Sequence, residues 1–264
     1  MKTQKIVLRI ILTVCVLAVV FFAAALIREL YIDSVSKSFY SGLTETIETR
    51  PGRPGETGPD VFDPAEPDET PAAEEDVWIP YVDFEKLSVS YPGIVGWIKL
   101  EGTDLHYPVM QYTDNDYFLT RLPDGTAHRS GSIFLDYRNS SDFSDKSILI
   151  YGHELRSGDM FAVLKNYRNQ EFYDANPVVN LYTPDKDYKI VLFAGYLAHS
   201  QRDHPPLQFA DEDEFLKYIE NLKSISLFDS SVSVTAESRI VSLCTCAYDF
   251  DEARFIVTGV LIEN

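Results

Sequence analysis

Near its C-terminus the chain reads Arg239-Ile240-Val241-Ser242-Leu243-Cys244-Thr245-Cys246, then a seven-residue acidic turn from Ala247 to Ala253, and then Arg254 with a second apolar run, Phe255 to Ile262. Two short apolar runs joined by a polar turn are typical of adjacent strands. If they pair antiparallel, Cys246 ends one strand and Arg254 begins its neighbour. A thiolate beside a cation and a histidine is a strong nucleophile for acyl transfer, so Cys246 is a candidate catalytic residue.

Cys246 has other interpretations. A cysteine at a strand end is more often a buried structural residue. Cys244 and Cys246 could bind a metal, but no second Cys/His pair stands at zinc-ligand spacing. A disulfide between them would be strained, because residues i and i+2 of a strand lie near the outer limit for bridging. The chain has three cysteines, which is no even disulfide framework, and in a chain that leaves the cytosol this favours a working thiol.

The partners of Cys246 must come from Arg254 and the five histidines. Arg254 could instead form an ion pair with an acidic residue of the turn: Asp249, Asp251 or Glu252. His153 is the best histidine by context, because the apolar run Ile148 to Tyr151 delivers it to the end of a buried strand and Gly152 allows a close approach. The other four are expected in solvated positions (His106, His128) and in a polar, proline-containing loop (His199, His204).

The C-terminal part of the chain, residues 77–264, predicts a mainly β fold, because short apolar runs alternate with turn signals. Closely spaced strands of this kind indicate a barrel or a sandwich. The predicted strands are Gly96 to Leu100, Ser132 to Leu135, Ser147 to Tyr151, Tyr188 to Tyr196, Arg239 to Leu243 and Phe255 to Ile262. The predicted helices are Asp83 to Tyr91, Met160 to Tyr167 and Asp211 to Lys223, and the last of these has an acidic first turn and one apolar face.

The N-terminus predicts a membrane anchor. Three basic residues lie within the first nine, and the run Ile10 to Ile27 has eighteen residues without a charge, enough to span the hydrocarbon core. The basic flank should stay inside, so residues 1–9 are expected in the cytoplasm and the rest of the chain outside. The sequence Ala23-Ala24-Ala25 resembles a cleavage site, but the apolar run exceeds a usual signal peptide and Arg28 follows closely, which favours an uncleaved anchor.

Residues 28–76 are predicted to be a juxtamembrane segment and a disordered linker. From Glu45 to Asp76 there are eleven acidic residues, six prolines and three glycines. Such a stretch buries too little apolar surface to offset its ordering entropy. Residues 77–264 then form one domain.

The charge balance bears on the partners. Residues 77–264 contain 28 acidic and 16 basic residues, a balance of −12, which argues against nucleic acid or an anionic surface as the main partner. No Gly-rich phosphate loop and no H-E-x-x-H zinc helix occur in the sequence. We expect no metal and no cofactor.

The motifs also carry a family resemblance. Ser242-Leu243-Cys244-Thr245-Cys246 with Arg254 resembles the sortase signature T-L-x-T-C and its downstream arginine, and Tyr151-Gly152-His153 resembles the segment with the sortase histidine. Ser242 stands where the motif usually has threonine, and a cysteine at the variable position, Cys244, is unusual. Further segments resemble class B sortases in the same order: Gly93 to Ile98, Tyr107 to Val109, Gly131 to Asp136 and Ser157 to Phe161. The resemblance covers roughly Val77 to Asn264, plus the anchor.

The resemblance implies a closed, eight-stranded sortase β-barrel with a few peripheral helices, on the outer face of a Gram-positive cell membrane. It implies a cysteine transpeptidase that cleaves a C-terminal sorting motif after threonine, with a thioester on Cys246. A peptidoglycan amine would then accept the surface protein. His153 and Arg254 would complete the catalytic set, and Thr245 would shape the substrate pocket or only pack the strand end.

Two other classes stay open. A papain-like cysteine peptidase also pairs cysteine with histidine, but it usually carries the cysteine early in the chain on a helix, with asparagine as the third member. A non-catalytic surface adhesin would keep the anchor and the β-domain without needing a reactive thiol.

Overall fold

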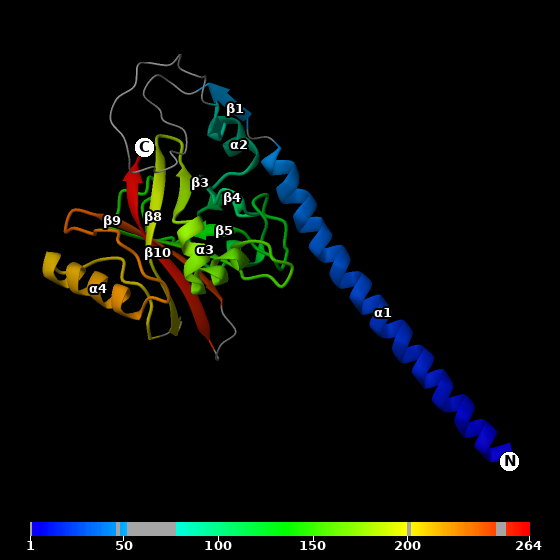
Figure 1. Ribbon diagram of the computed structural model, residues 1–264. Helices are drawn as coiled ribbons and strands as arrows, with labels where there is room; N and C mark the ends of the chain where they lie inside the picture. Colours follow the sequence, from blue (N-terminus) through cyan, green and yellow to red (C-terminus); the bar gives the residue numbers. More distant parts are fainter. Residues whose placement is uncertain (1, 46–47, 52–77, 200–201, 247–251) are drawn as a thin grey trace, which may run out of the picture. The chain divides into compact units, whose positions relative to one another are not determined.

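The computed structural model describes residues 2–45, 48–51, 78–199, 202–246 and 252–264. The chain forms two units, Met1–Gly42 and Leu43–Asn264. The first unit is formed by helix α1 (Lys2–Thr44), and the second contains the β-barrel (Figure 1).

Helix α1 contains the apolar run predicted from the sequence. It is 43 residues long and continues through the segment after Arg28 to its end at Thr44. Its apolar side chains from residue 11 to residue 31 are exposed, Phe21 and Phe22 among them. From Ile11 the helix is long and apolar enough to cross a membrane.

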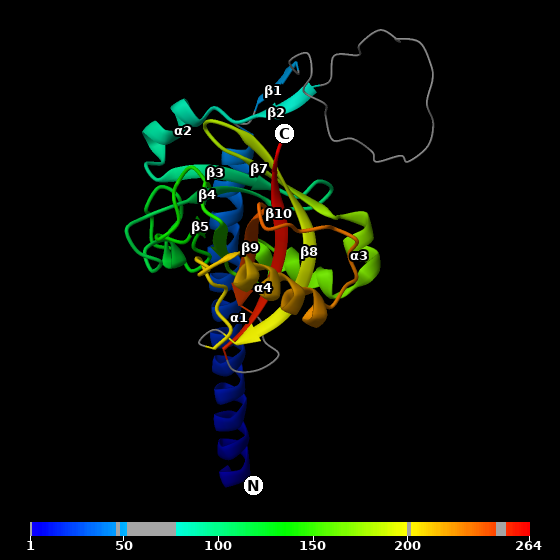
Figure 2. The same cartoon turned by 90° about the vertical axis from the view of Figure 1, so that its left-hand side faces the viewer.

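The second unit is a closed barrel of eight strands, as predicted (Figures 1 and 2). Around the barrel the order is β10-β8-β7-β3-β4-β5-β6-β9. The pairs β4–β5 and β6–β9 are parallel, and the other six are antiparallel. The strands are β3 (Ile94–Lys99), β4 (His106–Met110), β5 (Ile133–Leu135), β6 (Ser147–Gly152), β7 (Val178–Tyr182), β8 (Asp187–His199), β9 (Arg239–Cys246) and β10 (Ala253–Glu263).

The second unit also contains helices and a two-stranded sheet outside the barrel. They are β1 (Glu48–Pro51), β2 (Trp78–Tyr81), α2 (Phe84–Ser90), the 3₁₀ helices η1 (Phe118–Thr120) and η2 (Phe161–Arg168), α3 (Gln170–Ala175) and α4 (Glu212–Ile225). The three predicted helices correspond to α2, η2 and α4, although η2 is a 3₁₀ helix. Within the predicted linker, Glu48–Pro51 pairs with Trp78–Tyr81, and residues 46–47 and 52–77 lie outside the described part.

Strand β9 is buried on both faces. Alternate residues of a strand face opposite sides, yet every residue from Ile240 to Thr245 is buried. One face belongs to the barrel interior, and helix α4 covers the other (Figure 2). Buried side chains of α4 and the strands form this outer cluster: Leu149, Phe193, Ala194, Tyr196, Ala198, Phe215, Ile219, Leu222, Ile240, Cys244, Ile256 and Val260.

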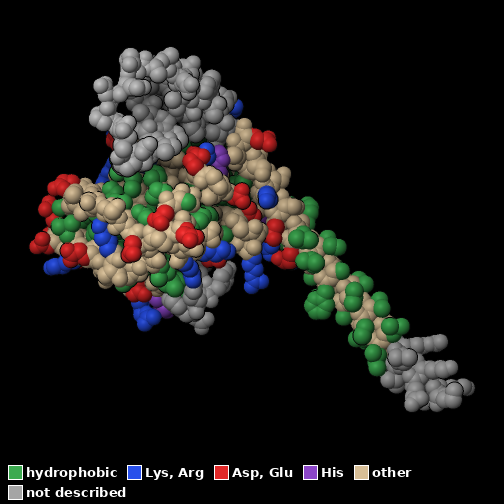
Figure 3. All heavy atoms as spheres, in the orientation of Figure 1, with side chains coloured by type: hydrophobic (Ala, Val, Ile, Leu, Met, Phe, Trp, Pro, Cys, Tyr) green, Lys and Arg blue, Asp and Glu red, His purple; other side chains and the backbone are tan. Residues whose placement is uncertain are grey.

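The sequence specifies both the start and the buried face of α4. Asp211 is the N-cap, and its side chain accepts a hydrogen bond from the backbone N–H of Glu214 at 2.8 Å. Phe215, Ile219 and Leu222 are buried at helical spacing. The acidic residues of the first turn favour the positive end of the helix dipole, and acidic side chains gather over this region in Figure 3.

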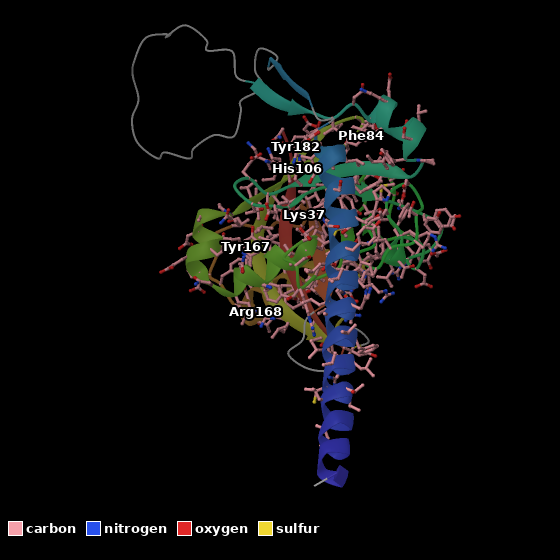
Figure 4. The ribbon with its side chains drawn as sticks, turned by 90° about the vertical axis from the view of Figure 1, so that its right-hand side faces the viewer. Lys37, Phe84, His106, Tyr167, Arg168 and Tyr182 are labelled. Carbon is pink, nitrogen blue, oxygen red and sulfur yellow. The ribbon has the colours of Figure 1, made fainter. Side chains whose placement is uncertain are left out.

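The prediction that His106 is solvated is wrong. His106, labelled in Figure 4, begins β4. Its ring packs edge-on against Trp97 at 5.5 Å between centroids, and its Nε2 is buried. Burial lowers the pKa of His106 to about 4, and the charge of Lys99 adds to this effect. The imidazole is therefore neutral in the folded barrel at neutral pH.

We expect the barrel to lose stability as the pH falls from about 6.5 to about 4, because the unfolded chain protonates His106 in this range while the folded chain does not. Because the imidazole is only partly buried, the unfolding free energy should fall by about 2 kcal/mol, which is less than the pKa shift of His106 alone would give. The loss is measured by urea unfolding of the full chain in detergent at both ends of this pH range, for the wild type and for His106→Phe. The carboxylates titrate in both proteins, so equal pH dependence of the two would contradict the expectation.

Candidate active site

Three strand ends meet at one end of the barrel. Strands β6 and β9 run parallel with Gly152 opposite Thr245, and β9 and β10 run antiparallel with Cys246 opposite Arg254. His153 directly follows Gly152. The backbone therefore brings His153, Cys246 and Arg254 together from three adjacent strands, and the antiparallel pairing of the two C-terminal strands agrees with the expectation from the sequence.

A backbone carbonyl fixes one side of the His153 ring. His153 Nε2 lies 2.7 Å from the carbonyl oxygen of Leu119, in η1. A carbonyl oxygen only accepts hydrogen bonds, so Nε2 carries a proton and donates it. The protonation that can change during a reaction is then at Nδ1.

Two glycines allow this arrangement. A Cβ at Gly152 would lie 2.7 Å from the ring of Phe161, so only glycine lets η2 pack against the end of β6. Gly131 has φ +56° and a Cβ there would lie 2.5 Å from the Leu119 carbonyl oxygen. The close approach expected at Gly152 is confirmed, and Gly131 allows close packing against the carbonyl that holds His153.

Arg254 is half-buried at the start of β10. Its Nη1 donates to the carbonyl oxygen of Ala253 at 3.0 Å. Ala198 of β8 lies on its other side in the sheet. Of its predicted ion-pair partners, Asp249 and Asp251 lie outside the described residues.

Thr245 and Cys244 are buried next to the candidate nucleophile. Thr245 is 1% exposed and Cys244 is 5% exposed. Cys244 belongs to the outer cluster under α4, whereas the Thr245 hydroxyl has no hydrogen-bond partner among the described residues. Thr245 therefore packs beneath the strand end, and its hydroxyl is not presented to solvent.

The other histidines lie elsewhere. The assignment of His199 to a loop is wrong, because β8 is longer than predicted and ends at His199, opposite Ala253. His128 is half-buried rather than solvated, and its Nδ1 contacts Ser130 Oγ at 2.6 Å. Within residues 2–45, 48–51, 78–199, 202–246 and 252–264, no group of three or more His, Cys, Asp or Glu side chains is arranged to hold a metal ion.

A polar network beside the site is absent from the sequence predictions. The Tyr151 hydroxyl donates to Asp136 Oδ2 at 3.1 Å and lies 2.8 Å from His204 Nε2. Arg138 forms two side-chain hydrogen bonds with Asp136, at 2.8 and 2.7 Å. Burial alone would raise the pKa of Asp136, but hydrogen bonds from Arg138 and Asn115 outweigh it and lower the pKa to about 2.

Comparison with known proteins gives a consistent set of relatives. The chain is 34% identical over 184 residues to sortase B of Listeria monocytogenes, which covers 69% of this chain and 74% of that protein. It is 32% identical over 182 residues to sortase B of Staphylococcus aureus, covering 68% and 75%. The barrel resembles the structure of the Staphylococcus aureus sortase B-substrate complex, with a TM-score of 0.65, 31% identity, and coverage of 68% of this chain and 84% of that one. No family model matches the chain.

Proposed function

The chain belongs to the class B sortases, which are cysteine transpeptidases of cell-wall anchoring, and we propose that Cys246, His153 and Arg254 are its catalytic residues. The observation that carries the proposal is the strand register, with Cys246 opposite Arg254 and His153 following the residue opposite Thr245. Residues two positions apart on a strand share a face. Tyr151 and Cys244, two positions earlier, both pack in the outer cluster, which supports an active site on this outer face.

In the proposed reaction the Cys246 thiolate attacks the carbonyl carbon of the threonine in a sorting motif. The C–N bond to the following residue then breaks, His153 gives a proton to the departing amine, and a thioester remains on Cys246. A peptidoglycan amine attacks the thioester, loses its proton to His153 and forms a new amide. The C–S bond breaks and the thiolate returns.

Arg254 and Thr245 have different proposed roles. The Arg254 guanidinium donates hydrogen bonds to the oxyanion that forms at the attacked carbonyl. The proposed role of the buried Thr245, which faces the opposite side of β9 from Cys244, is to support the strand end that carries Cys246.

The proposed substrates are surface proteins with a C-terminal sorting motif, and the Staphylococcus aureus relative has been solved in a substrate complex. We propose that α1 anchors the enzyme in the cell membrane with a single pass. The basic residues before the apolar run favour a cytoplasmic N-terminus and an extracellular catalytic domain.

Product analysis tests the function. The full chain in detergent is incubated with sorting-motif peptides and a defined amine, and products are identified by mass spectrometry. Amide formation with the amine, through a thioester intermediate, supports a transpeptidase. Hydrolysis alone, unaffected by the amine, would indicate a peptidase, and no thiol labelling by a peptide vinyl sulfone would indicate an adhesin.

We expect Arg254→Lys to lower kcat/KM at least about 100-fold, the usual scale for losing one oxyanion donor. Lysine keeps the charge but not the planar fork of donors, so the variant separates directed hydrogen bonds from charge. Steady-state kinetics and thermal unfolding measure the two effects. Arg239→Lys is the matched control, because Arg239 lies at the far end of β9 and donates to the Phe143 carbonyl. If Arg254→Lys kept near-full activity, or lost activity only because it unfolds, the role of Arg254 would be structural and not catalytic.

A further inference from the structure

A strained residue ends the loop that follows the proposed catalytic histidine. Met160 has φ 59° and ψ −128°, a backbone conformation that L side chains rarely adopt. The N–H of Ala162 donates to the carbonyl oxygen of Asp159 at 3.3 Å, so residues 159–162 form a β-turn. Met160 is the second residue of this turn, where such angles define type II′ and favour glycine. A bulky side chain therefore occupies a position suited to glycine.

This β-turn is bonded to the backbone of His153. The N–H of Phe161 donates to the His153 carbonyl oxygen at 2.9 Å, and Glu154 pairs with Met160 in an isolated antiparallel bridge. The ring of His153 is held separately, by the Leu119 carbonyl at 2.7 Å. The β-turn thus holds the backbone of the histidine, and η1 holds its ring. A change in the β-turn would move the backbone relative to the carbonyl that orients the ring.

A hydrogen bond from the barrel fixes the strained peptide. The N–H of Met160 donates to the hydroxyl oxygen of Tyr107, on β4, at 3.2 Å in a buried position. Burial raises the pKa of Tyr107 to about 12, so this hydroxyl is neutral at neutral pH. A flip of the peptide between residues 159 and 160 would remove the positive φ. It would also carry the N–H away from Tyr107 and leave a buried donor unpaired.

Other contacts hold the same β-turn without setting the direction of this N–H. The ring of Phe161 packs at Gly152, where a Cβ would lie 2.7 Å from it, and the Met160 side chain is only 2% exposed. Both contacts are made by side chains, which keep their places when a neighbouring peptide flips. A strained backbone persists where its surroundings determine it. The Tyr107 hydroxyl supplies the contact that selects the strained direction.

We infer that Tyr107 is a positioning residue, whose hydroxyl holds Met160 in the strained conformation and thereby keeps His153 in place against the Leu119 carbonyl. Tyr107 acts through the β-turn and does not touch the reacting atoms. The inference rests on the proposed function only for its effect on catalysis, because the β-turn and its hydrogen bonds do not depend on the reaction.

Tyr107→Phe tests the inference without any use of activity, because it removes the hydroxyl and keeps the ring. Hydrogen exchange of residues 153–161, measured by mass spectrometry on the full chain in detergent, should be at least about tenfold faster in the variant. The His153 Nε2–H signal in ¹⁵N-edited NMR spectra, assigned by its loss in His153→Gln, should be present in the wild type and broadened in Tyr107→Phe. Equal exchange in the two proteins would overturn the inference.

Tyr173→Phe is the matched control. Tyr173 is a buried residue of α3, and its hydroxyl lies 3.2 Å from the Leu192 carbonyl oxygen and 2.7 Å from Ser230 Oγ. The variant also loses the hydrogen bonds of a buried tyrosine hydroxyl, so its stability should fall. Exchange of residues 153–161 and the His153 signal should stay as in the wild type. Equal changes in Tyr107→Phe and Tyr173→Phe would overturn the inference, because they would reflect lost stability alone.

Two substitutions of Met160 separate backbone strain from the loss of a hydrogen bond. Met160→Gly and Met160→Ala both remove the buried side chain, but alanine keeps the Cβ that strains a positive φ and glycine does not. Adding Tyr107→Phe should speed the exchange of residues 153–161 at least about fivefold in Met160→Ala and less than about twofold in Met160→Gly. Thermal unfolding of each variant sets a temperature at which all of them are folded. Equal effects in the two backgrounds would overturn the inference.

Kinetics test whether the β-turn positions His153 for catalysis. A displaced imidazole should impair proton transfer more than peptide binding, so kcat with a sorting-motif peptide should fall about tenfold in Tyr107→Phe while KM changes little. In the Met160→Gly background the same change should lower kcat less than about twofold. A wild type with no transpeptidase activity would contradict the proposed function and leave the exchange and NMR results standing. Unchanged kcat with altered exchange would overturn the positioning role.

Discussion

Replacing Cys246 with alanine should abolish cleavage and transfer, with a loss of at least about 10,000-fold in kcat. The proposed reaction passes through a thioester on this sulfur, which alanine cannot form. Peptide cleavage assays measure the loss, and mass spectrometry after acid quenching measures the covalent peptide adduct. The wild type should accumulate the adduct and Cys246→Ala should not.

Cys244→Ser is the matched control, because it removes the neighbouring thiol and leaves Cys246 in place. Cys244 is buried in the outer cluster, so a hydroxyl there should lower stability by about 1 kcal/mol while most activity remains below the unfolding temperature. An inactive Cys244→Ser with an active Cys246→Ala would show that the nucleophile is assigned to the wrong cysteine.

Replacing His153 with alanine should lower kcat/KM by about three orders of magnitude or more, since the same ring gives a proton to the departing amine and takes one from the incoming amine. The ring is already held by the Leu119 carbonyl at 2.7 Å, so its loss removes an oriented group rather than a flexible one. Kinetics with an activated ester substrate, whose leaving group needs no proton, should show a smaller loss in the acylation step.

His199→Ala is the control for this prediction. His199 ends β8 and lies opposite Ala253, one residue before Arg254, so it is close to the site without a proposed part in proton transfer. Activity within about tenfold of the wild type is expected. Comparable losses at His153 and His199 would point to a metal site, and a chelator would then inhibit the wild type.

The local features of the fold could be predicted from the sequence. The two C-terminal runs and the turn between them predicted the β9–β10 pair, because each run is longer than a turn and bounded by polar residues. The start and apolar face of α4 followed from Asp211 and the helical spacing of its buried residues. The eight-stranded closure came from the family resemblance, not from these patterns.

Other elements gave too weak a local signal. Strand β7 was missed, because its residues alternate between partly and fully buried and Asn180 interrupts the short apolar run. His106 was predicted to be solvated although it lies in a strand-like stretch, Leu105 to Pro108, yet strand pairing places it against Trp97. Burial set by a partner strand cannot be read from the strand's own residues.

In the candidate site, too, some features could be predicted from the sequence and others could not. Cys246, His153 and Arg254 were recognised by residue type and motif. The Leu119 carbonyl has no side-chain signal at all, and the contact between Tyr151 and His204 joins residues 53 positions apart. Contacts of this range depend on how the barrel closes, so the sequence alone did not predict them.

The parallel pairing of β6 with β9 has a consequence for how the enzyme matures. Strands that pair with about 90 residues between them form late in folding, because a long loop must be closed before the contact is gained. His153 and Cys246 come together only at this step. The unfolded chain therefore carries a thiol that has the reactivity of an ordinary cysteine until the last strands join. The nucleophile is thus activated only when folding is complete. In a partly folded chain, Cys246 should not react with a peptide to form a thioester.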